Sequence, residues 1–488
     1  MLKDKIIQKE EREFLITFLD EYFLKPKYSP YLIDYKLAEK ELEFIVRPDC
    51  NQKCDYCYLT NFGKDIYKIS RRKGKDVLLN NLKAVLNTFE KNKIIIPTIQ
   101  LYAGDLFYDK LIYPIFEIVY EYYYKIYKKE PAFFENMEKG KGTNEVRIVI
   151  PTNYSFVKGE GNILELRKWV EKFGEMNIKI NLSCSADGKY ATYVREKKNE
   201  KEVDEYYQSI MYAIAEFNGG IHPMISAESI STSIQNYDWW VDQLTNPENI
   251  LYGRKDIQPM MLEVRNGQNS WNETTIGEYL KLLNHIFDFR FKLNGKDPAK
   301  MAYHLVKGDG QDGSAKGCDE YDPIFIYPMN SGPRRPNSLL TCGLGSSLQI
   351  YLADLSIVPC HRLAYEEFIG GKFIANEAEL TDLIPLNTSG YAGIVMGNNV
   401  NQPRCNQCHL YDFCIRGCLG AQYEETGEVY CPIDSVCNFF DKKHEFLIKK
   451  YSETGILEAL NQADYLSQHE KDSYNDLFKY YMEKKEKV

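Results

Sequence analysis

Short runs of β-branched and aromatic residues alternate with longer, helically patterned stretches between residue 41 and about residue 290. The helical stretches include residues 76–91 and 162–173, whose apolar side chains fall on one face. This order predicts six successive βα units around a parallel sheet. The strand-like runs cover residues 41–46, 94–102, 146–152, 178–184, 222–227 and 260–265.

The length of 488 residues exceeds that of one average domain. We predict an α/β protein with a partial (β/α)6 barrel of the TIM type over residues 41–293. A poorly patterned connection over residues 294–341 leads to a cysteine-rich domain with little regular structure over residues 342–440. Residues 1–40 are expected to form an N-terminal helical extension, and residues 441–488 are expected to form C-terminal helices.

Composition and charge argue against several classes of protein. Hydrophobic residues make up 44% of the chain and charged residues 27%, which suits a packed core rather than global disorder. The net charge of −9 disfavours a broad nucleic-acid-binding surface, and the basic run at residues 71–75 is interpreted as a solvated loop. No signal peptide and no run of about 18 apolar residues occurs, so we expect a cytoplasmic protein that contacts neither nucleic acid nor membrane.

Three cysteines, Cys50, Cys54 and Cys57, follow the first predicted strand at C-x3-C-x2-C spacing. Thirteen cysteines in a reducing compartment indicate metal clusters rather than a disulfide framework. A 4Fe-4S cluster held by three thiolates from one loop leaves one iron without a protein ligand, and an open iron can bind a co-substrate. A zinc site or reactive surface thiols remain the alternatives, although zinc motifs usually pair one C-x2-C with a second.

A second group of cysteines lies beyond the connection, and its core is the run C-x2-C-x5-C-x3-C. A zinc ribbon would use four of these thiols but not all of them, whereas each iron-sulfur cluster takes up to four. The seven cysteines of this group are Cys342, Cys360, Cys405, Cys408, Cys414, Cys418 and Cys437.

With Tyr58 directly after its third cysteine, the first motif resembles that of the radical S-adenosylmethionine (SAM) superfamily. The resemblance implies that the open iron binds SAM and that an electron from the cluster cleaves SAM to a 5'-deoxyadenosyl radical. It also implies that Tyr58 contacts the adenine. The resemblance implies further cofactor-binding residues. Ala103, Gly104 and Asp105 stand where the family has Gly-Gly-Glu. The others are Asn153 in PTNYSF, Ser185 in SCSADG, and Arg195.

The second group resembles the seven-cysteine SPASM domain, which carries two auxiliary 4Fe-4S clusters. By this resemblance one cluster takes Cys342, Cys360 and Cys418, with Cys318 preferred over Cys431 as a further ligand. The chain has Leu355 where the family usually has a glycine, and Cys184, in an apolar run, is interpreted as a core residue. The other auxiliary cluster takes Cys405, Cys408, Cys414 and Cys437.

Auxiliary clusters can accept the electron that a substrate radical loses, so we predict a net two-electron oxidation. The resemblance implies a cytoplasmic oxidoreductase that matures a ribosomally made precursor peptide by a thioether or carbon-carbon crosslink. Its expected partners are this peptide or protein and an electron donor such as flavodoxin or ferredoxin. Because only forty residues precede the first predicted strand, a leader peptide would be recognised by the connecting segment, by the C-terminal helices or by a separate leader-binding protein.

Three other functions remain open. One is formylglycine formation of the anaerobic sulfatase-maturase type, in which an aspartate follows the second SPASM cysteine, whereas this chain has His361 there. His361 is a candidate base, since imidazole titrates near neutral pH, or a residue that tunes a cluster. The others are a dehydrogenase acting on a small molecule and a noncatalytic carrier of electrons or clusters.

Overall fold

The structure is a computed structural model of the whole chain. The residues that it describes are 41–61, 73–92, 94–102, 104–135, 146–158, 160–191, 200–254, 260–263, 271–308, 325–326, 347–387, 390–391, 394, 403–414 and 418–486. The predicted N-terminal extension, residues 1–40, lies outside them.

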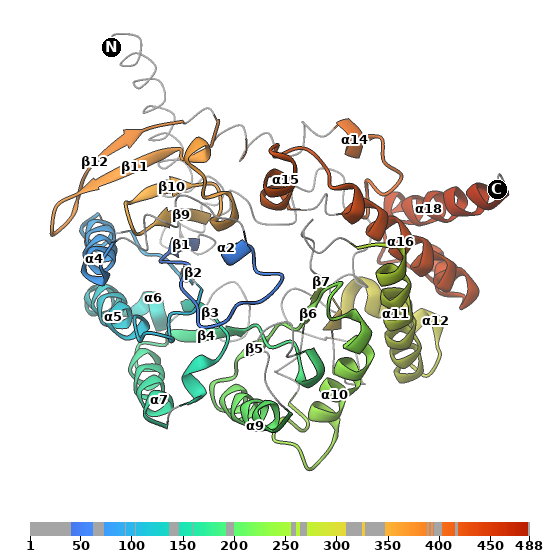
Figure 1. Cartoon of the computed structure of the whole chain (residues 1–488), viewed down its shortest axis with the longest axis horizontal. Helices are drawn as coiled ribbons and strands as arrows, with labels where there is room; N and C mark the ends of the chain where they lie inside the picture. The colour runs from blue at the N-terminus through green and yellow to red at the C-terminus, as the bar shows by residue number, and fades with distance from the viewer. Residues whose placement is uncertain are drawn as a thin grey trace, which may run out of the picture.

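The central feature is a sheet of nine strands in the order β12-β11-β10-β9-β1-β2-β3-β4-β5 (Figure 1). Strands β1 to β5 pair in parallel in chain order, as the βα pattern predicted. These strands are β1 (Glu41–Ile45), β2 (Thr98–Tyr102), β3 (Arg147–Thr152), β4 (Lys179–Cys184) and β5 (Gly220–Ile221).

The sheet continues on the other side of β1 with strands from the cysteine-rich half of the chain. Strand β9 (Ser347–Tyr351) pairs in parallel with β1 over five residue pairs. Three antiparallel strands follow it, namely β10 (Ser356–Val358), β11 (Gly371–Ala375) and β12 (Leu380–Pro385). The prediction of little regular structure is therefore wrong for this part of residues 342–440.

A second sheet of three parallel strands contains β6 (Met224–Ile225), β7 (Met260–Glu263) and β8 (Phe325–Ile326). The predicted strand over residues 222–227 is divided between the two sheets, because Pro223 stands between β5 and β6 and has no N–H for a ladder. The mixed α/β architecture is confirmed, but the described strands form two sheets and show no closed barrel.

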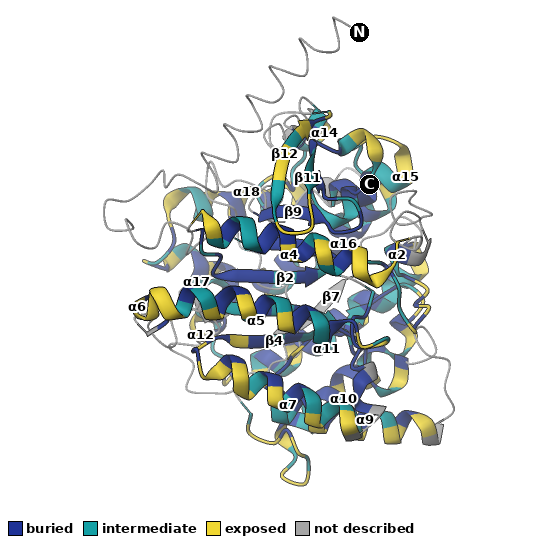
Figure 2. Cartoon of the chain, turned by 90° about the vertical axis from the view of Figure 1, so that its left-hand side faces the viewer, coloured by how far each residue is buried: buried dark blue, intermediate teal, exposed yellow. Residues whose placement is uncertain are grey.

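Helices cover one face of the large sheet. Alternate residues of β4 are buried against them, which is the period of a strand. Figure 2 shows α4, α5 and α7 stacked across β2 and β4 with their exposed residues turned outward. Fully burying each large apolar side chain at this interface contributes about 1.5–3 kcal/mol. The helices around the sheets are α4 (Lys75–Lys91), α5 (Ile112–Lys129), α6 (Pro131–Glu135), α7 (Glu160–Gly174), α9 (Glu200–Phe217), α10 (Ser233–Thr245) and α11 (Glu273–Leu293).

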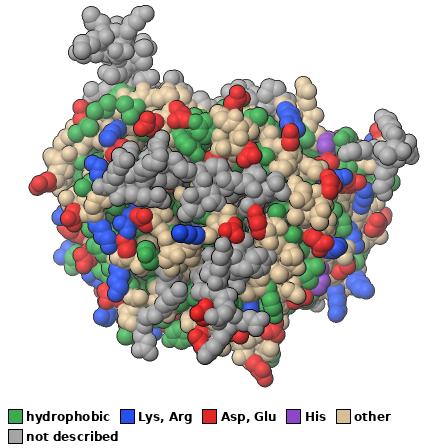
Figure 3. All heavy atoms as spheres, viewed as in Figure 1, with side chains coloured by type: hydrophobic (Ala, Val, Ile, Leu, Met, Phe, Trp, Pro, Cys, Tyr) green, Lys and Arg blue, Asp and Glu red, His purple; other side chains and the backbone are tan. Residues whose placement is uncertain are grey.

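The last described part of the chain forms helices beside α11 (Figure 1). None of the helices in the described residues is both long enough and apolar enough to span a membrane. Acidic and basic side chains are interspersed on the described part of the face in Figure 3. The remaining helices are α2 (Tyr58–Asn61), α12 (Pro298–Tyr303), α14 (Pro403–Asn406), α15 (Leu419–Thr426), α16 (Asp434–Glu453), α17 (Ile456–Gln462) and α18 (Gln468–Glu486).

Candidate cluster sites

The first three cysteines lie on one loop between β1 and α2, at the carboxyl edge of the parallel strands. The loop turns where the Cys57 N–H donates to the Cys54 carbonyl at 3.0 Å. The pKa of the Cys50 thiol is raised to about 11, chiefly by burial and also by the nearby Asp105, Cys54 and Cys57, while the Gln52 N–H acts to lower it. Thiols crowded in this way disfavour their own ionisation, so a bound cation would stabilise them as thiolates.

The loop is fastened to the segment that follows β2. The Gly104 N–H donates to the Arg47 carbonyl at 3.0 Å, and the Asp105 N–H donates to the Asp49 carbonyl at 2.9 Å. A Cβ at position 104 would lie 2.2 Å from the Asp49 carbonyl oxygen, so only glycine allows this close approach. Ala103, the first residue of the predicted cofactor segment, lies outside the described residues.

The Asp105 carboxylate is buried and accepts hydrogen bonds inside the protein. Its Oδ2 accepts from Thr152 Oγ1 at 3.0 Å and from the Asn153 N–H at 2.9 Å, and its Oδ1 accepts from the Phe107 N–H at 2.9 Å. These bonds join the segment after β2 to the end of β3. Contact between Asp105 and SAM stays a prediction, and what the geometry gives Asp105 is a role in holding neighbouring loops together.

Two further predicted SAM ligands lie near the ends of β3 and β4. Asn153 directly follows β3, and its side chain meets Cys50 and Asn51. Ser185 directly follows β4, is partly buried, and donates its N–H to the Thr152 carbonyl at 3.1 Å. Arg195 lies outside the described residues. Cys184 is fully buried, as its apolar run predicted.

Sequence reasoning missed Asp187, which joins the cysteine loop to the second sheet. Its buried carboxylate accepts from Tyr56 Oη at 2.6 Å and from the Met224 N–H at 3.0 Å. The signal was the Asp-Gly pair after β4, which is also common in ordinary turns. The side chain thus ties the middle of the cysteine loop to β6.

The second cysteine group meets the first site through His361. The His361 Nδ1 lies 2.8 Å from Oε1 of Glu43, a buried residue of β1. The imidazole stacks on Tyr102 with ring centroids 3.8 Å apart, and its centroid lies 5.8 Å from that of Tyr58. The hydroxyls of Tyr58 and Tyr102 hydrogen-bond to each other. His361 follows Cys360 in the chain, so these rings connect Cys360 to Tyr58 beside Cys57.

The sequence analysis did not predict Glu43 and Tyr102 as site residues. For Glu43 the signal was its position as a charged residue inside the apolar run ELEFIV. The register places Glu43 of β1 opposite Gln100 of β2 and Gln349 of β9. These three polar side chains therefore lie side by side on neighbouring strands, on the face of the sheet away from the helices.

Cys360 and Cys418, both predicted for the first auxiliary cluster, lie near each other. The pKa of Cys360 is raised to about 12, chiefly by burial and next by the nearby Cys418. The Leu363 N–H donates to Cys360 Sγ at 3.3 Å, and Arg362 between them forms an ion pair with Glu424 at 2.5 Å. Cys342 and Cys318, the other predicted ligands, lie outside the described residues.

The four cysteines predicted for the second auxiliary cluster line one hollow whose other lining residues are mostly apolar. Cys418 lines it too, while Cys431 lies before α16 and is not among its lining residues. Burial raises the pKa of Cys437 to about 12, with Cys414, Cys405 and Cys408 raising it and Arg404 lowering it. Thiols around an apolar hollow suit a cluster, which takes one thiolate on each iron. The described residues contain no group of three or more His, Cys, Asp or Glu side chains placed for a single metal ion. The four predicted ligands are Cys405, Cys408, Cys414 and Cys437.

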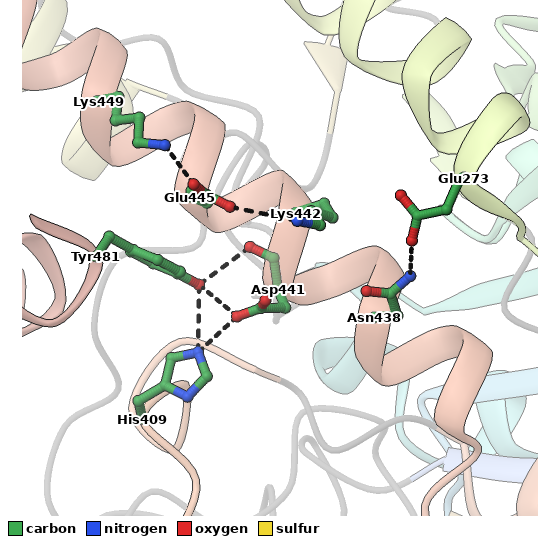
Figure 4. Close-up of polar contacts among 8 residues, drawn as sticks. All are labelled: Glu273, His409, Asn438, Asp441, Lys442, Glu445, Lys449 and Tyr481. Atoms are coloured by element: carbon green, nitrogen blue, oxygen red, sulfur yellow. Dashed lines mark hydrogen bonds and ion pairs between the residues drawn. The ribbon is translucent and has the colours of Figure 1, made fainter. Parts of the chain in front are cut away.

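A polar network outside this hollow joins its loop to the C-terminal helices (Figure 4). His409, next to Cys408, places Nε2 2.7 Å from Oδ1 of Asp441 on α16. Tyr481 on α18 donates to the same Asp441 oxygen at 2.9 Å. One face of α18 therefore holds the loop that carries the cysteines.

No family model matches the chain, and no curated protein matches it. The chain is similar to a solved structure described as native anSMEcpe with bound AdoMet and Cp18Cys peptide, at 14% identity and a TM-score of 0.47, covering 87% of this chain and 100% of that one. It is also similar to native anSMEcpe with bound AdoMet, at 12% identity and a TM-score of 0.48, covering 85% of this chain and 98% of that one. Both TM-scores are below 0.5, so this likeness assigns no activity to the chain.

Proposed function

We propose that this protein is a radical SAM enzyme with auxiliary iron-sulfur clusters that oxidises a peptide substrate. The observation that carries the proposal is the crowding of Cys50, Cys54 and Cys57 on one loop at the carboxyl edge of a parallel sheet, where α/β proteins bind their ligands. The hollow lined by five cysteines of the second group supports the part of the proposal that concerns auxiliary clusters.

The thiolates of Cys50, Cys54 and Cys57 would hold one 4Fe-4S cluster, and the other cysteines would hold two more. When bound, these clusters and SAM supply a radical that removes a hydrogen atom from an unactivated carbon, together with acceptors for the second electron. Gly104 and Asp105 fix the cysteine loop, and Asp187 joins it to β6. Tyr58 directly follows Cys57, and its ring is proposed to contact the adenine of SAM.

We propose that His361 contacts the substrate and acts as a base. It lies between Cys360 and the polar strand face, and its Nδ1 is held by Glu43. We propose that this imidazole accepts the proton that a substrate loses on oxidation. A histidine here in place of the maturase aspartate favours peptide crosslinking over formylglycine formation.

The test is anaerobic incubation of the iron-loaded protein with SAM, dithionite and short peptides encoded beside its gene. A peptide that loses two hydrogen atoms, with 5'-deoxyadenosine formed alongside, supports the proposal. Oxidation of a small molecule without peptide would favour the dehydrogenase function. Absence of 5'-deoxyadenosine from fully reduced protein would favour the carrier function.

A further inference from the structure

Asn153 is held on both sides of its backbone. Its N–H donates to Asp105 Oδ2 at 2.9 Å, and its carbonyl accepts from Tyr206 Oη at 2.7 Å. Asp105 comes from the segment after β2 and Tyr206 from α9, so two distant parts of the chain fix one residue. The Asn153 residue is only 5% exposed, which leaves its side chain little freedom.

The side-chain amide of Asn153 points at the cysteine loop. Its Nδ2 lies 2.8 Å from Asn51 Oδ1 and 3.3 Å from Cys50 Sγ. An amide nitrogen carries two hydrogens, and both have an acceptor here. The flipped amide would turn its oxygen toward a sulfur that is an acceptor when ionised, so the orientation with nitrogen toward Cys50 is favoured.

Cys50 receives a second N–H donor, from the backbone of Gln52 at 3.4 Å. Cys54 has a different neighbour, because its Sγ lies 3.8 Å from the Gln52 side-chain oxygen. Cys50 Sγ therefore has two N–H donors, one from its own loop and one from Asn153, which the fold brings from outside the loop.

We infer that Asn153 is a positioning residue for the cluster of the first motif, and that its N–H bond to Cys50 raises the reduction potential of that cluster. The inference rests on the proposed function, since it needs a cluster on Cys50, Cys54 and Cys57. Reduction adds negative charge that is shared by the ligand sulfurs, and a donor stabilises the more negative state. The role differs from the SAM contact predicted from sequence, because the donor faces a protein sulfur.

The test is a redox titration of the iron-loaded protein followed by electron paramagnetic resonance, using the signal that changes when SAM is added. Asn153→Leu keeps the side-chain size and removes the donor, so the midpoint potential is expected to shift to more negative values. Asn153→Asp places a carboxylate against the sulfur, so a larger negative shift is expected. Asn162→Leu is the control, since Asn162 donates to the Phe156 carbonyl instead, and it should leave the potential unchanged.

Tyr206→Phe keeps Asn153 but removes the hydroxyl that donates to the Asn153 carbonyl and accepts from Gln52 Nε2 at 3.5 Å, so a smaller negative shift is expected. If Asn153→Leu loses iron, the potential of Tyr206→Phe tests whether Asn153 affects the cluster. An unchanged or more positive potential in a variant that keeps the SAM-responsive signal overturns the inference alone. Wild-type protein that loads iron but shows no SAM-responsive signal contradicts the inference and the proposed function together.

Discussion

Gly104 is the residue on which the position of the cysteine loop depends most directly. A Cβ there would lie 2.2 Å from the Asp49 oxygen and 2.5 Å from the Pro48 oxygen, both backbone atoms that cannot move aside cheaply. Gly104→Ala is expected to lower the free energy of unfolding by about 1–3 kcal/mol, the usual cost of overpacking. Urea denaturation measures this loss.

Gly161 provides the matched control, because a Cβ at this position in α7 meets no atom within 4 Å. Gly161→Ala is expected to leave stability unchanged or to raise it by about 1 kcal/mol through helix propensity. Equal effects of the two substitutions would contradict the close approach at Gly104.

The raised pKa of Cys50 predicts how the stability of the iron-free protein depends on pH. Its pKa is raised to about 11 from the ordinary value of 9.0. Because the folded pKa is the higher one, this stabilising contribution is fully present below about pH 9 and is lost as the pH rises through about 11. Urea midpoints measured from pH 8 to pH 11 should fall less steeply in Cys50→Ala than in wild type. Parallel curves would count against burial of this thiol.

At the residue scale, spacing alone predicted a common loop for Cys50, Cys54 and Cys57. It did not predict the bonds of Asp105 to Thr152 and Asn153, because those partners are set by the packing of β2 against β3. The contact of His361 with Glu43 could not be predicted from the sequence either, since it joins residues far apart in the chain.

At the element scale, the apolar pattern placed the first four strands and the helices α4 and α7 to within a few residues. The pattern works there because alternate residues along a strand are buried, as in β3 and β4. Pairing of β9 with β1 could not be predicted, because local periodicity carries no information about which distant strand becomes the neighbour.

Helix α18 gives a prediction at this scale. Tyr481→Phe removes the donor to Asp441 beside the loop of Cys408, so we expect about 1 kcal/mol less stability and faster loss of auxiliary-cluster iron to a chelator. The matched control is Asn438→Ala, whose exposed bond to Glu273 of α11 lies in the same view (Figure 4). The control should lose iron at the wild-type rate. Equal loss from both variants would contradict the role of α18.

At the scale of the whole molecule, two cysteine groups from opposite halves of the chain share one α/β architecture. The pairing of β9 with β1 brings the second half into the main sheet, and Cys360 lies two residues after the end of β10. On the proposed function, this arrangement would suit the passage of an electron from a substrate near the first motif to auxiliary clusters.

The most direct test of this account is anaerobic reconstitution with iron and sulfide, followed by dithionite, SAM and mass spectrometry for 5'-deoxyadenosine. Wild type is compared with the triple alanine variant of Cys50, Cys54 and Cys57. The account predicts about twelve irons in wild type, about eight in the variant, and SAM cleavage only in wild type, because each cluster holds four irons. About four irons, or no SAM cleavage, in fully reduced wild type would contradict it.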